Sequence, residues 1–446
     1  MKRTLVKETI KKAGQEVLLK GWVNTRRDHG QIIFIDLRDR TGLMQVVFVG
    51  IEGAKELRPE WVVEIKGVVK ERPANLVNPK LITGKIEVEA RELKIFAKSQ
   101  ELPFDTAAAE LKVALPILLD YRPLSLRHPK VRPIFKVQET IIATFRESLV
   151  KQGFTEIQVP TIVPSVTEGG AQVFKLKYFD RDAFLAQSPQ LYKQIMVGVF
   201  ERVFTLAHAY RAEPSMTTRH ITEYLGLDAE MGFIDSFEDI MEVVEKVIRD
   251  ILAKLGKERK EELAVFSANL PKVSPKIPRL KMREAQQIIF ERTGRDNRKE
   301  PDLEPEDERE ICRYSLEKYG SDLIFITHYP TKKRPFYTYP DPKEPEFTCS
   351  FDLLGQGLEW VTGGRRINDY QMLLDHVKEW GNLPEDFEIY LQAFRYGMPP
   401  EGGFCLGAER MTMQILGLEN VREASLFPRD MERIDVRLPK KEETKK

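Results

Sequence analysis

The chain has 446 residues, of which 42% are apolar and 31% are charged. This length exceeds what one ordinary core supports, so two or three domains are expected. The 70 basic and 69 acidic residues give a net charge of +1, which excludes a protein that is basic throughout, and any nucleic-acid surface must be local.

Cysteine spacing and hydropathy indicate the redox state of the thiols and whether the chain crosses a membrane. Cys312, Cys349 and Cys405 lie far apart without metal-ligand spacing, which favours buried, reduced thiols over disulfides. No stretch reaches the roughly 18 apolar residues that a membrane span requires. We therefore expect no membrane segment and a cytoplasmic location.

The first 100 residues have the pattern of short strands separated by turns. Runs rich in β-branched residues predict strands at 17–23, 32–37, 43–49, 61–69 and 86–90. Five strands of this length suit a small barrel of the OB type, and an SH3-like barrel would fit the propensities nearly as well.

The remainder of the chain alternates between helical and strand patterns. Residues 101–130 contain several prolines and few periodic runs, as a hinge would. Apolar periodicity predicts a helix at 136–152 and amphipathic helices at 236–256 and 305–319. The charged residues 440–446 have the composition of a disordered tail. These patterns together indicate an α+β protein.

Three separated segments carry chemical information. Residues 153–160 predict a helix end followed by a strand that closes on Pro160, and residues 402–410 predict a glycine-rich strand that leads into a helix at Arg410. Between them, two predicted antiparallel strands flank a loop with Arg211 and Arg219 at its ends. Two guanidinium groups so placed can both reach one triphosphate, although a surface salt-bridge hairpin would give the same pattern.

In this order the three segments resemble motifs 1, 2 and 3 of class II aminoacyl-tRNA synthetases, and residues 21–30 and 33–40 resemble the OB domain of the aspartyl group. The match covers essentially the whole chain, in the short form of the archaeal-type aspartyl-tRNA synthetases. It implies an antiparallel catalytic sheet flanked by helices. The expected domains are an OB barrel, a hinge, a catalytic domain and a charged tail, at 1–102, 103–130, 131–438 and 439–446.

The resemblance implies an ATP site. Arg211 would contact the α-phosphate and the carboxylate of the activated amino acid, and Glu213 would contact the adenine amino group. Arg219 and His220 would lie near the outer phosphates, while Arg410 would stack on adenine. The wall beside Arg410 would be completed by Gly407, Ala408 and Glu409.

A magnesium ion is implied by the same resemblance. Glu359 would bind Mg²⁺ that bridges the phosphates, with Thr362 close by, because carboxylate and hydroxyl oxygens suit a hard ion. Arg211, Arg410 and Glu359 form the expected catalytic set. Because the amino acid carboxylate is itself the nucleophile, catalysis would consist of positioning and charge neutralisation.

For L-aspartate, the resemblance implies that Arg366 pairs with the side-chain carboxylate and that Lys193 lies beside it. Glu168 would hold the ammonium group. A pocket with two cations would leave them unpaired when a neutral amide binds, which is costly in a buried site. An exposed helix lysine is the alternative for Lys193. The full expected aspartate site comprises Glu168, Gln190, Lys193, Arg211, Thr362 and Arg366.

In the barrel, the resemblance implies an anticodon site. Phe34 and Gln45 lie on neighbouring predicted strands and Glu87 lies on a later one, an aromatic platform with polar groups that can read unstacked bases. Phe34 could instead fill the barrel core. Asn24 replaces a tryptophan found in some strict relatives. This replacement favours relaxed specificity, in which both tRNA(Asp) and tRNA(Asn) are charged.

Several positions depart from the family pattern. Asn368 and Glu401 replace usual histidines, and Arg365 replaces a residue that is commonly neutral. We expect Arg365 to pair with Glu401, which would otherwise repel an acidic substrate. Motif 1 mediates dimerisation in such enzymes, and its proline matches Pro160, so a homodimer is expected.

Three other functions remain open from the sequence. An asparaginyl-tRNA synthetase is disfavoured by Lys193. A paralogue that makes asparagine from aspartate and ammonia is disfavoured by the retained anticodon-type barrel. A catalytically silent tRNA-binding protein is disfavoured by the joint presence of Arg211, Glu359, Arg366 and Arg410.

Overall fold

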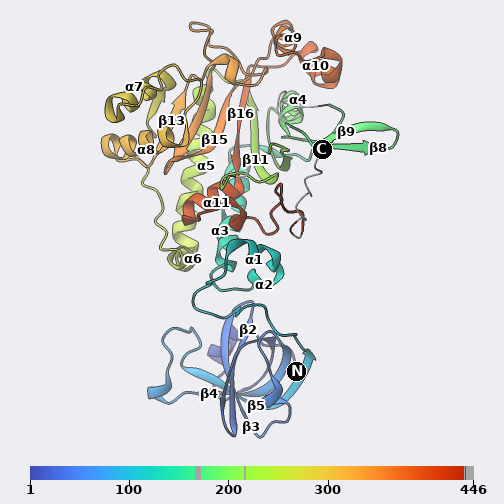
Figure 1. The fold of residues 1–446 in the computed structure, drawn as a ribbon, viewed down its shortest axis with the longest axis vertical. Coiled ribbons are helices and arrows are strands. Elements are labelled where there is room, and N and C mark those ends of the chain that lie inside the picture. The colour runs from blue at the N-terminus through green and yellow to red at the C-terminus, as the bar shows by residue number, and fades with distance from the viewer. Residues whose placement is uncertain (166–171, 215–216, 436, 438–446) are drawn as a thin grey trace, which may run out of the picture. The chain divides into compact units, whose positions relative to one another are not determined.

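The computed structural model describes residues 1–165, 172–214, 217–435 and 437. The chain divides into two compact units, residues 1–118 with 123–129 and residues 119–122 with 130–446 (Figure 1). The segment expected to be an irregular hinge contains two short helices, α1 (Leu115–Asp120) and α2 (Arg122–Ser125). The predicted charged tail lies outside the described residues. Among the described helices, none is long and apolar enough to cross a membrane.

The first unit contains a closed five-stranded barrel in which β3 pairs in parallel with β5. The predicted strands are confirmed, although several extend further than expected. Side chains alternate between the two faces of each strand: Ile33 and Ile35 are buried in the barrel, whereas Phe34 between them is half-buried on the outer face. The strands, in barrel order, are β1 (Glu16–His29), β2 (Ile32–Asp39), β3 (Gly42–Val49), β5 (Ile86–Ala97) and β4 (Val62–Glu71).

The second unit is built on an eight-stranded sheet whose inner pairs are antiparallel and whose two outermost pairs, β12–β13 and β10–β6, are parallel. A small sheet in the order β7 (Ile162–Val163), β9 (Arg181–Leu185) and β8 (Lys175–Tyr178) lies beside it. The main sheet runs in the order β12 (Arg279–Lys281), β13 (Leu323–Thr327), β14 (Ser350–Gly355), β15 (Leu358–Arg365), β16 (Glu401–Gly407), β11 (Glu223–Gly232), β10 (Arg202–Tyr210) and β6 (Thr155–Glu156).

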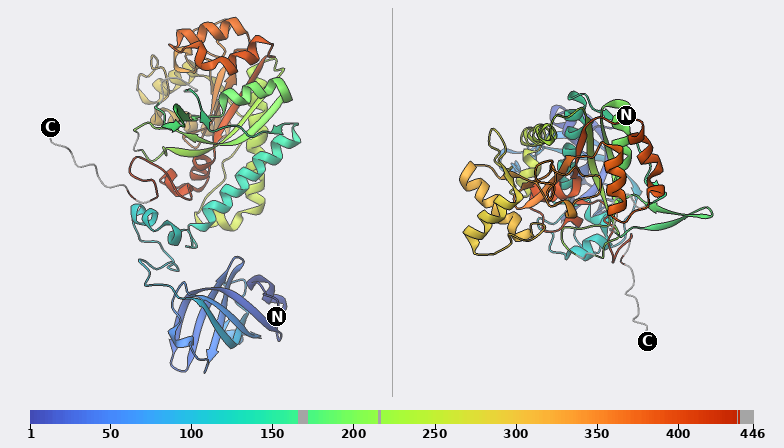
Figure 2. Two further views of the ribbon diagram at one scale, coloured as in Figure 1. Left: turned by 90° about the vertical axis from the view of Figure 1, so that its right-hand side faces the viewer. Right: turned by 90° about the horizontal axis from the view of Figure 1, so that it is seen from above.

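Helices α3 (Arg132–Lys151) and α5 (Phe237–Glu258) pack on each other along one face of the main sheet (Figure 2). Phe145 of α3 makes edge-to-face contacts with Phe204 and Phe404 of the sheet, with ring centroids 6.0 and 6.3 Å apart. This apolar layer fixes the strands from one side and leaves polar side chains to the opposite face.

The remaining helices surround the sheet. The three helices predicted from periodicity are confirmed as α3, α5 and α8, within a few residues at each end. Helix α8 spans Pro305–Tyr319. The other α-helices of this unit are α4 (Gln190–Phe200), α6 (Lys260–Val265), α7 (Met282–Thr293), α9 (Tyr370–Glu379), α10 (Glu388–Arg395) and α11 (Ala408–Leu416). Short 3-10 helices span Val6–Lys11, Ala54–Glu56, Ala74–Leu76, Thr331–Lys333, Pro384–Phe387 and Val421–Ala424. All three cysteines are free, as predicted, but Cys405 is only partly buried.

Candidate active site

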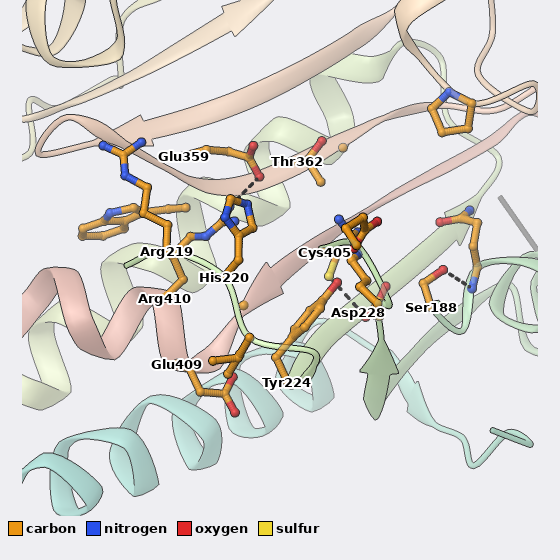
Figure 3. A pocket seen from close by; sticks show the side chains of 18 of the residues that line it. Ser188, Arg219, His220, Tyr224, Asp228, Glu359, Thr362, Cys405, Glu409 and Arg410 are labelled. Atoms are coloured by element: carbon orange, nitrogen blue, oxygen red, sulfur yellow. Dashed lines mark hydrogen bonds and ion pairs between the residues drawn. The ribbon is translucent and has the colours of Figure 1, made fainter. Parts of the chain in front are cut away.

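A cavity of about 610 Å³ opens on the polar face of the main sheet (Figure 3). Ala408 is fully buried and is not among the lining residues, and Glu168 lies outside the described residues. The remaining candidates for ATP, metal and aspartate binding all line this one cavity: Gln190, Lys193, Arg211, Glu213, Arg219, His220, Glu359, Thr362, Arg366, Gly407, Glu409 and Arg410.

Strand register explains how distant residues reach the same cavity. Asp352 of β14 lies opposite Thr362 of β15, Thr362 opposite Cys405 of β16, and Cys405 opposite Asp228 of β11. Residues directly opposite one another in an antiparallel sheet point to the same face. A polar row therefore crosses four adjacent strands, while intervening residues such as Phe404 face the apolar layer.

Arginines gather at one end of the cavity (Figure 3). Arg410, at the start of α11, donates to Glu359 at 3.3 Å, and Arg219 donates to Glu308 of α8 at 3.2 Å. The Arg211 guanidinium lies 5.6 Å from the centre of the Tyr224 ring. Three cationic groups so placed make this end of the cavity suited to a polyanion.

The pKa values of His220 and Glu308 are shifted at this end of the cavity. Burial, together with Arg410 and Arg211, lowers the pKa of His220, so its neutral form is favoured. Burial and Glu359 raise the pKa of Glu308 to about 7. Burial is the larger cause of both shifts, and the arginines near His220 and the carboxylates near Glu308 add to it.

Two carboxylates, Asp352 and Glu359, approach each other beside Thr362. Burial and the Asp352 charge raise the pKa of Glu359. Asp352 accepts a hydrogen bond from Arg334 at 2.8 Å through Oδ2, but its buried Oδ1 has no hydrogen-bond partner among the described residues. Arg334 also donates to the Thr362 hydroxyl at 3.2 Å. An unpartnered buried carboxylate oxygen beside a second carboxylate suits a hard cation.

The opposite end of the cavity contains the two cations expected to bind an acidic side chain. Lys193 is only 1% exposed, and its Nζ lies 2.9 Å from an Asp228 oxygen and 3.1 Å from a Glu230 oxygen. The alternative interpretation of Lys193 as an exposed lysine on a helix surface is therefore excluded. Burial alone would lower the pKa of Lys193, but the two carboxylates outweigh burial and raise it. Arg366 donates to Glu230 at 2.8 Å and to the carbonyl of Gly403 at 3.1 Å.

The first two glycines of the motif 3 segment are required by close packing. A Cβ on Gly402 would lie 2.3 Å from Ile240, and one on Gly403 would lie 2.2 Å from the Glu230 carboxylate. Only glycine therefore lets Glu230 reach Arg366. Around Gly407, which lines the cavity, a Cβ would in contrast meet only Arg410, at 3.6 Å.

The expected pair between Arg365 and Glu401 is wrong. Glu401 is fully buried and accepts a hydrogen bond from Gln194 at 2.7 Å, whereas Arg365 lies 4.2 Å from the centre of the Tyr339 ring. The cause is strand geometry, because consecutive residues point to opposite faces and only Arg366 shares the cavity side. Asn368 donates to the carbonyl of Met398 at 3.3 Å.

The candidate anticodon residues lie on the outer face of the barrel. Gln45 donates to Glu87 at 2.8 Å and accepts from Arg27 at 3.0 Å, and the Arg27 guanidinium lies 6.0 Å from the Phe34 ring centre. Phe34 is therefore not a core residue of the barrel. Asn24, at a bulge in β1, accepts a hydrogen bond from Arg38 at 2.9 Å.

Among the residues that sequence reasoning missed, Asp228 and Arg334 line the cavity, and Glu230 and Asp352 are buried acids behind the lining. Asp228 and Glu230 alternate in an otherwise apolar strand, a pattern that could have marked two buried acids on one face. Arg334 and Asp352 carry no comparable local signal, because only the register of β14 with β15 brings Asp352 beside Thr362.

Comparison with known proteins agrees with this architecture. Residues 115–431 match the model of the family described as tRNA synthetases class II (D, K and N), and residues 17–96 match the OB-fold nucleic acid binding domain. The chain therefore belongs to the class II tRNA synthetases of the D, K and N group.

Two curated relatives and one solved structure are similar over nearly their whole length. The chain is 44% identical to the aspartate–tRNA(Asp/Asn) ligase of Thermus thermophilus and 42% identical to that of Deinococcus radiodurans, with 97% of this chain and 99% of each relative covered. The structure of asparaginyl-tRNA synthetase from Pyrococcus horikoshii with asparaginyl-adenylate superposes with a TM-score of 0.88 at 34% identity, covering 97% of this chain and 99% of that one.

Proposed function

We propose that the protein is an aspartate–tRNA ligase that activates L-aspartate with ATP and transfers it to the 3′ end of tRNA(Asp) and of tRNA(Asn). The observation that carries this proposal is the convergence of Lys193 and Arg366 at one end of the cavity, with Arg211, Arg219 and Arg410 at the other. The names of the Thermus and Deinococcus relatives support the same activity.

The chemistry needs little acid–base work from the protein. An oxygen of the aspartate α-carboxylate attacks the α-phosphorus of ATP, the bond to the β-phosphate breaks, and pyrophosphate leaves. A hydroxyl of the terminal tRNA nucleotide then attacks the carbonyl carbon, and AMP leaves. Arg211 would hold the α-phosphate and offset the charge that develops on it, with Arg219 at the outer phosphates, while Arg410 would stack on adenine. Glu213 would select adenine, and His220, Gly407, Ala408 and Glu409 would complete the nucleotide site.

We infer that ATP binds with Mg²⁺ held by Glu359 and Asp352, with Thr362 beside it. The unpartnered Asp352 oxygen and the raised pKa of Glu359 support this assignment, because a cation would relieve both. The ion would neutralise phosphate charge. Among the described residues, no three His, Cys, Asp or Glu side chains form a metal site, and Mg²⁺ commonly completes its shell with phosphate and water.

Selection of aspartate over asparagine would depend on Arg366. Its Nε and Nη2 donate to Glu230 and Gly403, and its Nη1 makes no hydrogen bond among the described residues although the side chain lines the cavity. A side-chain carboxylate would accept from this donor, with Lys193 and Gln190 nearby. An amide would present N–H groups to the same cations. The likeness to an asparaginyl enzyme makes asparagine the second candidate. Lys193 and Arg366 are already paired with Asp228 and Glu230, contrary to the expectation of two unpaired cations, so the preference for aspartate would depend on the remaining Arg366 donor.

The barrel would read the anticodon through Phe34, Gln45 and Glu87, where an aromatic face adjoins an amide and a carboxylate. We propose that Asn24 permits both tRNA(Asp) and tRNA(Asn), since its short side chain is bonded to Arg38 and presents no bulky group. The names of the two relatives, which specify both tRNAs, agree with this assignment.

A homodimer would form through the region of motif 1. Val199 and Phe200, which end α4 just before β10, are 62% and 47% exposed, and Phe233, which follows β11, is 71% exposed. Strand β10 pairs with the edge strand β6, which precedes Pro160. Exposed apolar side chains in one place are typical of an interface. Light scattering would give twice the 51.6 kDa of one chain, and a monomeric mass at full activity would contradict the assignment.

Aspartate-dependent exchange of pyrophosphate into ATP tests the activation step directly. We expect exchange with L-aspartate and little with L-asparagine, and we expect Arg211→Ala to lower kcat by orders of magnitude, because a transition-state contact is removed. As a matched control, Arg365→Ala removes an arginine of the same strand region that faces away from the cavity and should retain activity. Exchange driven by asparagine alone would refute the proposal.

A further inference from the structure

A buried carboxyl group lies behind the pocket for the amino acid side chain. Glu401 opens β16, is 0% exposed, and accepts a hydrogen bond from Gln194 Nε2 at 2.7 Å through Oε1. The Gln194 amide orientation is fixed because its own Oε1 accepts from Gln190 at 2.9 Å and from the Tyr390 hydroxyl at 3.2 Å. Oε1 of Glu401 is therefore an acceptor only.

The second carboxyl oxygen of Glu401 lacks a hydrogen bond of this kind in the part of the chain that the structure describes. Oε2 of Glu401 is buried and has no hydrogen-bond partner among the described residues. An ionised carboxylate in this state would have only the Gln194 hydrogen bond at Oε1 and the charges of Arg366 and Lys193 to compensate for its lost solvation. Burial and the neighbouring Glu230 charge raise the pKa of Glu401 to about 8, so the neutral acid, with its proton on Oε2, predominates at neutral pH.

The charged groups that face Glu401 come from three directions. Glu230 projects from β11, Lys193 from α4, and Arg366 follows β15. The phenol of Tyr390 faces it from α10, and the apolar Ile240 of α5 packs at the adjacent Gly402. The group is thus enclosed by protein on every side, and it does not itself line the cavity.

The charges of this region balance only when Glu401 is neutral. Lys193 and Arg366 supply two positive charges, and Asp228 and Glu230 supply two negative charges through ion pairs of 2.8 to 3.1 Å. Ionised Glu401 would make the cluster net negative. A substrate carboxylate would then enter a repulsive field in a site with little water to screen it.

We propose that Glu401 is a positioning residue whose proton keeps the pocket receptive to an acidic amino acid, and that loss of this proton selectively weakens the binding of aspartate. Glu401 acts through the charges of its neighbours Glu230 and Arg366, which pair with each other at 2.8 Å. This inference rests on the proposed function, because it concerns the amino acid that the cavity accepts.

The sign of the effect follows from linkage. The arriving anion favours the neutral form of Glu401, so aspartate binding near pH 8 takes up protons, about half a proton per site when half of the free enzyme is ionised. Above that pH, the KM for aspartate should rise by up to about tenfold per pH unit. The KM for ATP should not follow this rise, because ATP binds at the other end of the cavity.

Calorimetry of L-aspartate binding at pH 8, in two buffers that differ in ionisation enthalpy, measures the proton uptake of the wild-type enzyme without any variant. Glu401→Gln should abolish the uptake and flatten the pH dependence of the KM for aspartate in pyrophosphate exchange. Glu310→Gln, which neutralises a buried carboxyl of α8 outside the cavity lining, should keep the wild-type profile.

The outcomes separate this inference from the function beneath it. Aspartate binding without proton uptake, or the same pH profile in wild type and Glu401→Gln, would overturn the role of Glu401 and leave the ligase intact. Absence of aspartate binding at every pH would overturn the proposed function and this inference with it. A rise in the KM for ATP parallel to that for aspartate would also overturn the inference, because the effect would then not be selective.

Discussion

Replacement of Lys193 by methionine tests the buried ion pairs of the cavity. The ammonium group is 1% exposed, and its removal leaves Asp228 with only the Cys405 thiol, 3.3 Å away, as a partner among the described residues. Breaking a buried pair in this way costs about 3–5 kcal/mol. The second unit has roughly 320 residues, so at about 2.1 cal/mol/K per residue each kcal/mol lowers its melting temperature by about 1.5 °C.

Differential scanning calorimetry should therefore show the transition of the second unit lowered by roughly 4–7 °C in Lys193→Met. The transition of the barrel unit is the internal control and should stay in place. Adding Asp228→Asn should restore part of the loss, because the unpaired buried charge is removed. A transition within about 1 °C of wild type would refute the reasoning, since such a small change is typical of a solvated surface pair.

Three further changes probe the metal, the anticodon face and the barrel. Glu359→Gln should raise the Mg²⁺ concentration for half-maximal pyrophosphate exchange about tenfold or more, and an unchanged requirement would remove this ligand from the assignment. Phe34→Ala should raise the KM for tRNA about 5- to 150-fold, as expected for one lost stacking contact, while tRNA-independent exchange is unaffected. Glu60→Gln should lower only the barrel transition in calorimetry, because the Glu60 carboxylate pairs with Arg38 and Arg127 at 2.8 and 2.7 Å.

Much of the fold could be predicted because local signals agree with the tertiary structure. Alternation in residues such as Ile33, Phe34 and Ile35 specifies which side of a strand faces the core, and apolar periodicity specifies α3 and α5. The two helices of the expected hinge were missed, because six and four residues are too few for a periodic signal. The predicted strands were also shorter than the observed β1 and β5, because the polar ends of these strands are stabilised by pairing with neighbouring strands and carry few residues of high strand propensity.

The site was predicted in part. The resemblance of glycine-rich and arginine-bearing segments to family motifs identified 12 of the residues that line the cavity. The residues that pair with those side chains and shift their pKa values were not predicted from the sequence. Asp352 lies beside the lining residue Thr362 through strand register, and Glu401 was assigned the wrong partner because the sequence does not say which of two consecutive arginines faces it.

Aminoacylation with radiolabelled aspartate and asparagine, each against transcripts of tRNA(Asp) and tRNA(Asn), tests the central claim most directly. We predict that aspartate is attached to both tRNAs and that asparagine is attached to neither. Attachment of aspartate to tRNA(Asp) alone would contradict the role given to Asn24. Attachment of asparagine, or of neither amino acid, would contradict the account of the pocket built around Lys193 and Arg366.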